Sequence, residues 1–390
     1  MLLPLTPPPP PPHKYAWGSP SLIADLEGRA PSGTPEAEVW FGDHPADPAQ
    51  TPDGRTLDVW LSEHGVRSGA PSHLPYLLKL LAAESPLSIQ AHPSIAQAEA
   101  GFAREEAAGI ARNAPRRTYR DSNHKPELIV AVSDEFRAVV GLRDLAATRR
   151  LVTELGDGAR PLAARLEYAD ASLAAVLDWV LSEAAAAEVR AVIDAAAGAT
   201  LPNFSAELDL VRSMNGQFPG DPGIVVALLM NLVTLRRGEG LFVPAGVLHA
   251  YLSGLGVELM AASDNVLRGG LTSKHIDVDE LLAVVDARPG RPNVVRPRAV
   301  APGVERYHVP VADLALDRVS VTAGQGVEIV VDSATIALAT TGTLSILGGM
   351  TNGTVTLRPG SAIFVTPDEG RLTVTGYGEA FLAAPGLRLG

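Results

Sequence analysis

The sequence predicts a mainly β fold that is interrupted by one helical insertion. Its 390 residues include 37 glycines and 32 prolines, an excess of turn residues that is typical of a chain rich in short strands. Several segments alternate polar and apolar residues, which favours half-buried strands. Between about Asp144 and Asp221, by contrast, the chain is rich in alanine and has few β-branched clusters. We therefore expect strands on both sides of a helical segment.

The first 143 residues mix loops, strands and helices. A proline run, Pro7–Pro12, favours a polyproline II lead-in. Two segments have strand character, namely Glu38–Phe41 and Leu87–His92. Three further segments are predicted to be helical, the last with Gly109 as its stop signal: Leu57–His64, Tyr76–Ala82 and Ile95–Ala108.

The middle of the chain carries clear helical signals. Five apolar residues follow the spacing of one helix face: Leu173, Val176, Leu177, Val180 and Leu181. Asp221-Pro222 then predicts the start of a buried helix over Ile224–Leu235, because Asp caps helices and Pro suits the first turn.

Strand signals return after Gly238. We expect strands in Gly240–Leu252 and Val257–Ala261, with turns at Pro244–Gly246 and Ser253-Gly254. Asp277, with Glu280 three residues on, predicts a capped helix that ends at Val285. The segment Arg288–Arg298 is expected to be a linker. In the tail, Thr354–Leu357 alternates before a turn at Arg358–Gly360, so the tail is predicted to be a separate all-β module.

Composition excludes several classes of function. The formal net charge of -12 argues against binding of a nucleic-acid backbone, which needs clustered cations. The absence of cysteine excludes thiolate nucleophiles, iron–sulfur clusters and Cys-ligated zinc. No segment has 18 uninterrupted apolar residues, and Met1–Leu5 lacks the features of a signal peptide. We expect a soluble, cytoplasmic protein with no membrane partner.

Three short segments carry residues suited to metal binding. In an extended Ser88–His92, the side chains of Ser88, Gln90 and His92 share one face. In Asn123–Glu127, Lys125 and Glu127 share a face, and Val247–Tyr251 places His249 after a Pro-Ala-Gly turn. Taken alone, the first segment is more typical of a half-exposed strand, the second of a charged loop, and His249 of a core histidine. Together, two imidazoles, a carboxylate and an amide are ligands that zinc accepts.

A fourth segment, Ala262–Lys274, has the character of an anion site. Arg268 and Lys274 flank Gly269-Gly270, where the backbone can approach a ligand closely. The guanidinium of Arg268 can bind phosphate through two parallel hydrogen bonds. The alternative is a solvated basic loop.

In their order along the chain, these segments resemble the type I mannose-6-phosphate isomerase family. The resemblance covers about residues 15–285, with a weaker echo at 357–361. The matching segments are Tyr15–Gly18, Ala37–Trp40 with Gly42 and His44-Pro45, Pro86–Pro93, Asn123–Glu127, His249–Leu252 and Ser263–Arg268. The proline lead-in and the compact, alanine-rich insertion depart from the family pattern. Neither departure touches the ligand motifs.

The resemblance implies two cupin-like β-barrel (jelly-roll) domains and a helical domain. Residues 1–143 and 222–298 would form the catalytic cupin with its linker. Residues 144–221 would form the helical insertion, and residues 299–390 the C-terminal cupin-like domain. The implied reaction is the reversible conversion of mannose 6-phosphate into fructose 6-phosphate, by proton transfer through an enediol or enediolate.

The resemblance also implies roles for individual residues. One zinc ion per chain would be held by Gln90, His92, Glu127 and His249. The active-site arginine would be Arg268, which could bind phosphate or stabilise charge at the reacting carbons; we expect the second role. The remaining assignments are Lys125, Glu258 and Asp264 as base or positioning groups, Ser88 and Lys274 as phosphate contacts, and Trp17 and Tyr251 as the lining of the sugar pocket.

Two other functions stay open at this stage. The chain could isomerise an unphosphorylated aldose, or it could be a non-catalytic, metal-containing cupin that binds sugars. Arg268 and Lys274 favour a small phosphosugar as the substrate. Sequence leaves the oligomeric state undetermined, and a monomer is compatible with it. It also leaves open the choice between zinc and other divalent ions.

Overall fold

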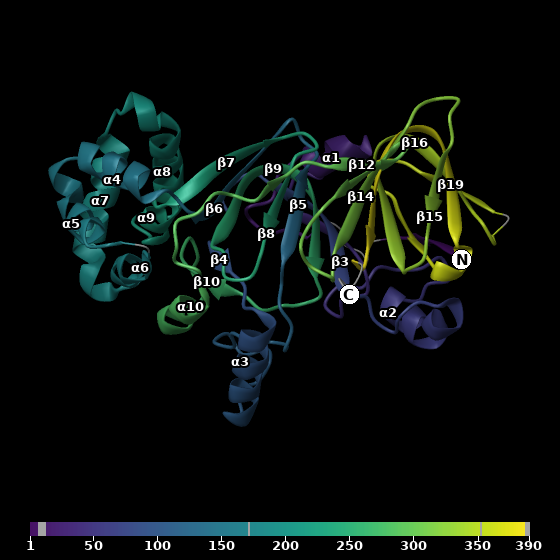
Figure 1. Cartoon of the computed structure of the whole chain (residues 1–390), viewed down its shortest axis with the longest axis horizontal. Coiled ribbons are helices and arrows are strands. Elements are labelled where there is room, and N and C mark those ends of the chain that lie inside the picture. Colours follow the sequence, from purple (N-terminus) through teal and green to yellow (C-terminus); the bar gives the residue numbers. More distant parts are fainter. Residues whose placement is uncertain (7–12, 171, 352, 387–390) are drawn as a thin grey trace.

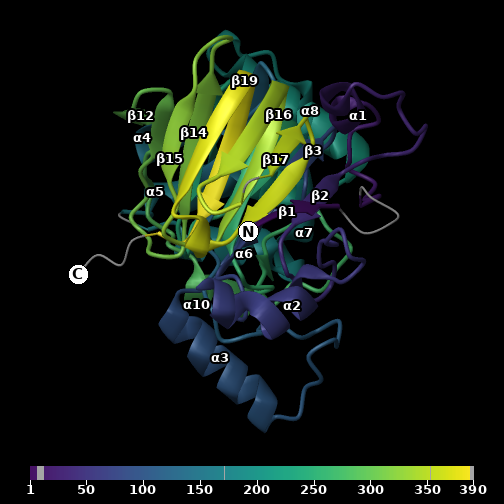
Figure 2. The ribbon, with the colours of Figure 1, turned by 90° about the vertical axis from the view of Figure 1, so that its right-hand side faces the viewer.

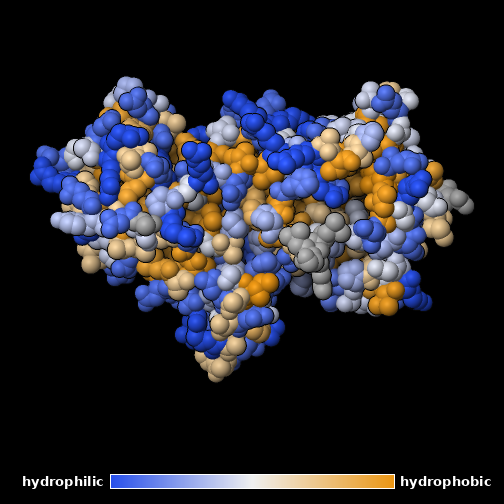
Figure 3. All heavy atoms as spheres, viewed as in Figure 1, coloured by the Kyte–Doolittle hydropathy of each residue, from blue (hydrophilic) through white to orange (hydrophobic). Residues whose placement is uncertain are grey.

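A computed structural model describes residues 1–6, 13–170, 172–351 and 353–386. The polyproline II lead-in expected over Pro7–Pro12 lies outside these residues. The described chain is mainly β, with two antiparallel sheets side by side and a group of helices beyond one of them (Figure 1). None of the described helices is both long and apolar enough to cross a membrane. Hydrophilic side chains are interspersed with hydrophobic ones over the face shown in Figure 3.

The first sheet has ten strands and is organised around β9 (His249–Ala261). This 13-residue strand pairs with β3, β4, β5 and β6. The other strands of the sheet are β2 (Glu38–Phe41), β3 (Tyr76–Ala83), β4 (Gln90–Ala91), β5 (Glu127–Ala131), β6 (Glu135–Leu142), β7 (Met230–Arg236), β8 (Gly240–Val243), β10 (Leu267–Arg268) and β11 (Val294–Val295). Segments distant in sequence therefore meet along β9.

The second sheet has nine strands and contains most of the C-terminal region. Its strands are β1 (Leu2–Leu5), β12 (Arg298–Ala301), β13 (Val304–Tyr307), β14 (Ala315–Val321), β15 (Val327–Val330), β16 (Thr335–Gly348), β17 (Thr354–Leu357), β18 (Ala362–Val365) and β19 (Arg371–Ala384). Strand β1 pairs with β18. The first residues of the chain thus join the C-terminal sheet rather than the sheet built by the rest of residues 1–143. Burial of Leu2 and Leu5 accounts for this placement.

The two sheets share one hydrophobic cluster. It includes Leu78 of β3 and Leu259 of β9 from the first sheet, together with Ile336, Phe364 and Phe381 from the second. All five side chains are buried. Burial of this apolar surface is a driving force for packing the sheets together, and Figure 2 shows the second sheet in front of the first.

The predicted helical insertion is present and lies at the end of the molecule away from the second sheet (Figure 1). It consists of α4 (Leu145–Glu154), α5 (Arg160–Glu167), α6 (Ala174–Leu181), α7 (Ala186–Gly198) and α8 (Ser205–Gln217). The predicted apolar face is buried at Leu173, Val176, Leu177 and Val180. The remaining helices are α1 (Leu22–Glu27), α2 (Leu57–Trp60), α3 (Ile95–Ala107), α9 (Gly223–Leu228) and α10 (Val278–Val284).

Three expectations for local structure were wrong. The segment Tyr76–Ala82 is strand β3, and every residue of β3 is buried, so no alternation marked it as a strand. The helix expected over Ile224–Leu235 ends at Leu228, and the chain continues into β7. Ser253-Gly254 is not a turn, because β9 runs through it. Gly254 has φ +115°, and an added Cβ would lie 2.7 Å from the Glu135 carbonyl oxygen, so only glycine fits this irregularity.

Candidate metal centre and catalytic cavity

Three predicted metal ligands meet at the ends of strands. His92 follows β4, Glu127 begins β5 and His249 begins β9. The Nε2 atoms of His92 and His249 lie 3.1 Å from Glu127 Oε1 and Oε2, respectively. One ligand atom from each residue lies within 4.8 Å of the others, and all three residues are buried. Pairing of Gln90 with His249 in β4 and β9 aligns the two segments.

The imidazole rings are oriented by backbone carbonyl groups. His92 Nδ1 lies 2.7 Å from the Asn265 carbonyl oxygen, and His249 Nδ1 lies 3.1 Å from that of Val247. With a proton on each Nδ1, both Nε2 atoms present a lone pair toward Glu127. His92 Nε2 is buried and has no hydrogen-bond partner, although Glu127 is near. Burial lowers the pKa of His92 to about 4, so its ring is neutral at pH 7. A neutral, unpartnered imidazole nitrogen fits a metal ligand.

Glu127 is held as a carboxylate. Burial by itself raises the pKa of Glu127, but the positive charge of the nearby Lys125 leads the effects that outweigh burial, and this pKa is held well below its usual range. Lys125 Nζ lies 3.0 Å from Oε1, and the Tyr251 hydroxyl donates to Oε2 over 3.3 Å. The ionised carboxylate is the form that binds a metal.

Gln90 lies on the edge of the same cavity. Its side-chain amide donates to Ser88 Oγ over 3.2 Å. This orientation leaves the amide oxygen free to coordinate a cation. The cavity is also lined by Ser88, Lys125, Glu127, His249, Tyr251 and Glu258. Seven of the predicted site residues therefore line one cavity. His92 lies behind this lining, in contact with Glu127.

Lys79 and Glu38 also line this cavity, and neither was predicted from the sequence. Lys79 Nζ lies 3.6 Å from a Glu258 oxygen, 3.9 Å from a Glu38 oxygen and 4.6 Å from the centre of the Trp40 ring. The signal that could have identified Lys79 was a single cation within the apolar run of β3.

Burial and the charge of Glu127 raise the pKa of Glu258 to about 7, while Lys79 opposes the shift.

Besides His92, four predicted site residues lie outside this cavity lining. Trp17 packs against the Tyr15 ring, with 5.5 Å between ring centres. Asp264 is partly exposed, and its Oδ1 lies 3.2 Å from His44 Nε2. Arg268 is opposite Gln90 in the pairing of β10 with β4. Lys274 lies six residues beyond Arg268, in a loop.

Arg268 borders a second, smaller hollow. Residues of the loops around Arg116 and His275 complete the lining of this hollow. Arg268 Nε is buried and has no hydrogen-bond partner among the described residues. Burial and the positive charge of Arg120 lower the pKa of Arg268, and Arg120 also acts on Lys274. Sequence analysis missed Arg120, which precedes the Asn123–Glu127 motif and carries no motif signal of its own.

Comparisons with known proteins point to one family. The family model "Phosphomannose isomerase type I, catalytic domain" matches residues 10–145. Mannose-6-phosphate isomerase of Escherichia coli (strain K12) is 34% identical over 380 residues, covering 94% of this chain and 95% of the relative. The Homo sapiens protein of that name is 32% identical over 402 residues, covering 91% and 92%.

Solved structures are similar over the whole fold. The crystal structure of mannose 6-phosphate isomerase from Salmonella typhimurium bound to its substrate, fructose 6-phosphate, and to zinc has a TM-score of 0.88 and 31% identity, and the match covers 99% of this chain and 100% of that one. A zinc-bound holo form of mannose 6-phosphate isomerase has a TM-score of 0.87 and 31% identity, with the same coverage.

Proposed function

The chain belongs to the type I mannose-6-phosphate isomerase family, and we propose from this premise that its buried His92–Glu127–His249 cluster holds one zinc ion at the active site. The enzyme is an aldose–ketose isomerase, and its substrates are mannose 6-phosphate and fructose 6-phosphate. The observation that carries the metal assignment is the convergence of two imidazole nitrogens on one ionised carboxylate in a buried site.

Gln90 is the proposed fourth ligand. Its amide oxygen is free, and β4 aligns it with His249. A neutral amide leaves more positive charge on the metal than a second carboxylate would. When bound, zinc supplies Lewis-acid polarisation of the sugar oxygens. The rings of His92 and His249 are already oriented for this role by the carbonyl groups of Asn265 and Val247.

The reaction moves a proton between two adjacent sugar carbons and needs a base. Glu258 is the best supported of the three candidates, because it lines the cavity and has a pKa of about 7. Lys125 is engaged by Glu127, and Asp264 is engaged by His44. We assign Glu258 as the base and Lys79 as the cation that favours its ionised form.

Arg268 is the proposed donor to negative charge that develops on the enediolate. Its pairing position opposite Gln90 places it next to the metal ligands. Its buried, unpartnered Nε is a donor that substrate could use. Ser88 and Tyr251 line the proposed sugar-binding cavity, whereas Trp17 lies outside this lining and stacks on Tyr15.

A coupled assay tests the function directly. We expect turnover with mannose 6-phosphate and fructose 6-phosphate, and a much lower kcat/KM with free mannose. Comparable values for the free sugar would identify an isomerase of unphosphorylated aldoses. Loss of all turnover in zinc-loaded protein would instead support the non-catalytic sugar-binding alternative.

The base assignment has its own test, with Asp264→Asn as the matched control. Glu258→Gln should lower kcat by about 10²–10⁴-fold, the usual contribution of a positioned base. In the unmodified enzyme, kcat/KM should fall as the pH drops below the pKa of Glu258, because protonation removes the base. A cation bound at the metal site would shift this fall in kcat/KM to a pH below the pKa of about 7 that Glu258 has without it. A larger loss in Asp264→Asn than in Glu258→Gln would reverse the assignment.

The finer architecture is also part of this proposal. Two cupin-like barrels, with residues 144–221 as a helical insertion, agree with the two antiparallel sheets and with the group of helices. A cytoplasmic location suits an enzyme whose substrates are sugar phosphates.

A further inference from the structure

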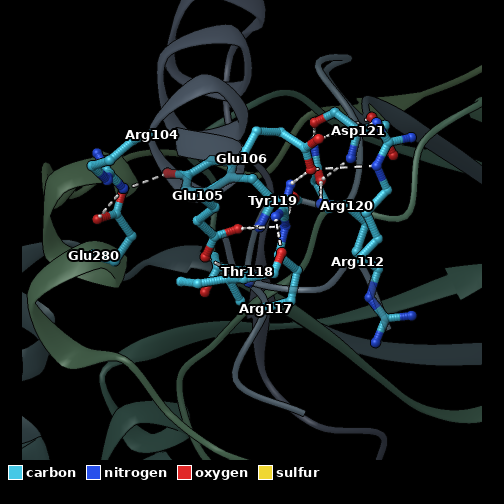
Figure 4. Close-up of polar contacts among 12 residues, drawn as sticks. Arg104, Glu105, Glu106, Arg112, Arg117, Thr118, Tyr119, Arg120, Asp121 and Glu280 are labelled. Carbon is cyan, nitrogen blue, oxygen red and sulfur yellow. Dashed lines mark hydrogen bonds and ion pairs between the residues drawn. The ribbon is translucent and has the colours of Figure 1, made fainter. Parts of the chain in front are cut away.

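The loop between α3 and β5 is held by a buried ionic network (Figure 4). The two carboxylate oxygens of Glu105 accept hydrogen bonds from the backbone N–H groups of Thr118 and Tyr119, over 3.1 and 2.8 Å. The Arg117 side chain is fully buried and pairs with Glu105 at 2.9 Å and with Glu106 at 2.8 Å. Buried ion pairs of this kind are costly to break by removing one partner. Helix α3 therefore fixes the course of the loop.

Two further anchors hold the same loop. The Tyr119 hydroxyl donates to Glu280 of α10 over 2.6 Å, and Glu280 also pairs with Arg104 at 2.8 Å. The Tyr119 ring packs over Gly101, where an added Cβ would lie 2.4 Å from the ring. On the other side, the Asn265 side chain accepts from the Arg120 backbone N–H over 2.7 Å. Asn265 also fixes the ring of His92 through its carbonyl group.

These anchors fix the backbone of Arg120 and leave its side chain exposed. Among the residues that the structure describes, the Arg120 guanidinium has no hydrogen bond and no ion pair. The same holds for the charged groups of Arg268 and Lys274. Thr118 of the same loop lines one hollow with Arg268 and with His275, which follows Lys274 in the chain. Burial is the main cause that lowers the pKa of Arg268 and of Lys274, and the positive charge of Arg120 adds to it in both. Asp264, on whose pKa Arg120 also acts, is already paired with His44. The three cations repel one another, and a bound anion would remove this repulsion.

We propose that Arg120 is a specificity-determining residue, which binds the phosphate group of the sugar together with Lys274, and that Glu105 is its positioning residue. This inference rests on the proposed function, because it assigns the phosphorylated end of the same substrate. Arg268 is opposite Gln90 in the pairing of β10 with β4 and therefore lies beside the proposed metal ligands. The two ends of the substrate would thus be bound by different segments of one rigid site.

Arg120→Gln is the direct test, and Arg112→Gln is its control. Arg112 lies in the same loop, is exposed and pairs with Glu106 away from the site. In Arg120→Gln, we expect the KM for mannose 6-phosphate and the inhibition constant of inorganic phosphate to rise together by about 10-fold or more. The kcat should stay within about 2-fold of the unmodified enzyme, because hydrogen bonds to the phosphate are lost equally in the ground state and the transition state. Arg112→Gln should leave both constants unchanged. Unchanged constants in Arg120→Gln, or equal shifts in both variants, would overturn the inference.

Glu105→Gln tests the positioning role. Its melting temperature should fall, since the buried Arg117 loses one of its two carboxylate partners, and the KM of the folded enzyme should also rise. If Glu105 acts through Arg120, the double variant should have the KM of Arg120→Gln alone. Glu105 would be only structural if the separate increases in KM multiply in the double variant. The same conclusion would follow if Glu105→Gln lowers the melting temperature but has a normal KM. Failure of the unmodified enzyme to turn over mannose 6-phosphate would instead reject the proposed function.

Discussion

The two sheets have similar construction and different interiors. Each is antiparallel and organised around long strands, β9 in the first sheet and β16 and β19 in the second. Inside the first sheet lie Lys79, Glu127 and Glu258, all nearly inaccessible to solvent. The second sheet instead has an apolar cluster that includes Leu344 and Ile363. Among the described residues, the group of His and Glu side chains suited to metal binding lies in the first sheet.

This difference shows that charged groups inside a sheet need compensating partners. Removing a charge from water is unfavourable unless a partner compensates it. In the first sheet, Lys79 compensates Glu38 and Glu258, while Lys125 compensates Glu127. In the second sheet, apolar burial contributes stability with no such requirement. The comparison therefore predicts that changes in the first interior affect chemistry and that changes in the second affect folding.

Metal removal should give the largest effect. A chelator is expected to abolish turnover, and added zinc should restore it, because the metal acts in the reaction itself. His249→Ala should lower zinc content and reduce kcat by more than about 10³-fold, since the loss of one electrostatic donor alone costs about 10²–10³-fold. Metal content and kcat are measured on the same samples. Full activity in a demonstrably metal-free preparation would contradict the assignment.

Arg268→Ala should have the next largest effect. We expect kcat to fall by about 10²–10³-fold with little change in KM, because a donor to the developing charge is lost. Arg268→Lys should rescue poorly, since a point charge cannot reproduce a planar guanidinium. The melting temperature should hardly change, because Arg268 is only half-buried. A raised KM with normal turnover would move Arg268 to phosphate binding.

Leu344→Ala should affect the second sheet in the opposite way. Leu344 is fully buried in β16 and far in sequence from the site. Its truncation should lower the free energy of unfolding by about 2–5 kcal/mol, as cavity formation in a core does. The kcat of the folded fraction should stay normal. A kcat loss comparable to that of Arg268→Ala would mean that the two interiors are coupled.

Asp317→Asn should give the smallest effect. Asp317 of β14 pairs with Arg306 of β13 across the strands, at 2.7 Å, in a partly exposed position. Solvent screening limits such a pair, so we expect a loss of less than about 1 kcal/mol in the free energy of unfolding and normal activity. Urea unfolding measures the first quantity and the coupled assay the second. A loss of several kcal/mol would show that charge pairing is also important in the second sheet.

The sequence alone determined features that depend on near neighbours. The capped helix α10 begins after Asp277, whose side chain accepts from the Glu280 backbone as expected. The helix expected over Ile95–Ala108 is present as α3, and the apolar face of α6 is buried. Alternation also placed Gln90 and His92 near one another, because strand geometry repeats every two residues. Motif order along the chain was enough to indicate the family and the ligand types.

Tertiary structure alone decided which distant residues meet. Lys79 reached the cavity because β3 is a strand buried on both faces, where no periodicity distinguishes strand from helix. Arg120 approached Arg268 because Glu105 of α3 and Asn265, which precedes β10, both bind the backbone of its loop, and these two residues are far apart in sequence. Strand β1 joined the last sheet through pairing across the whole length of the chain. These contacts depend on how segments far apart in sequence pack together. The spacing of residues within one segment carries no information about that packing.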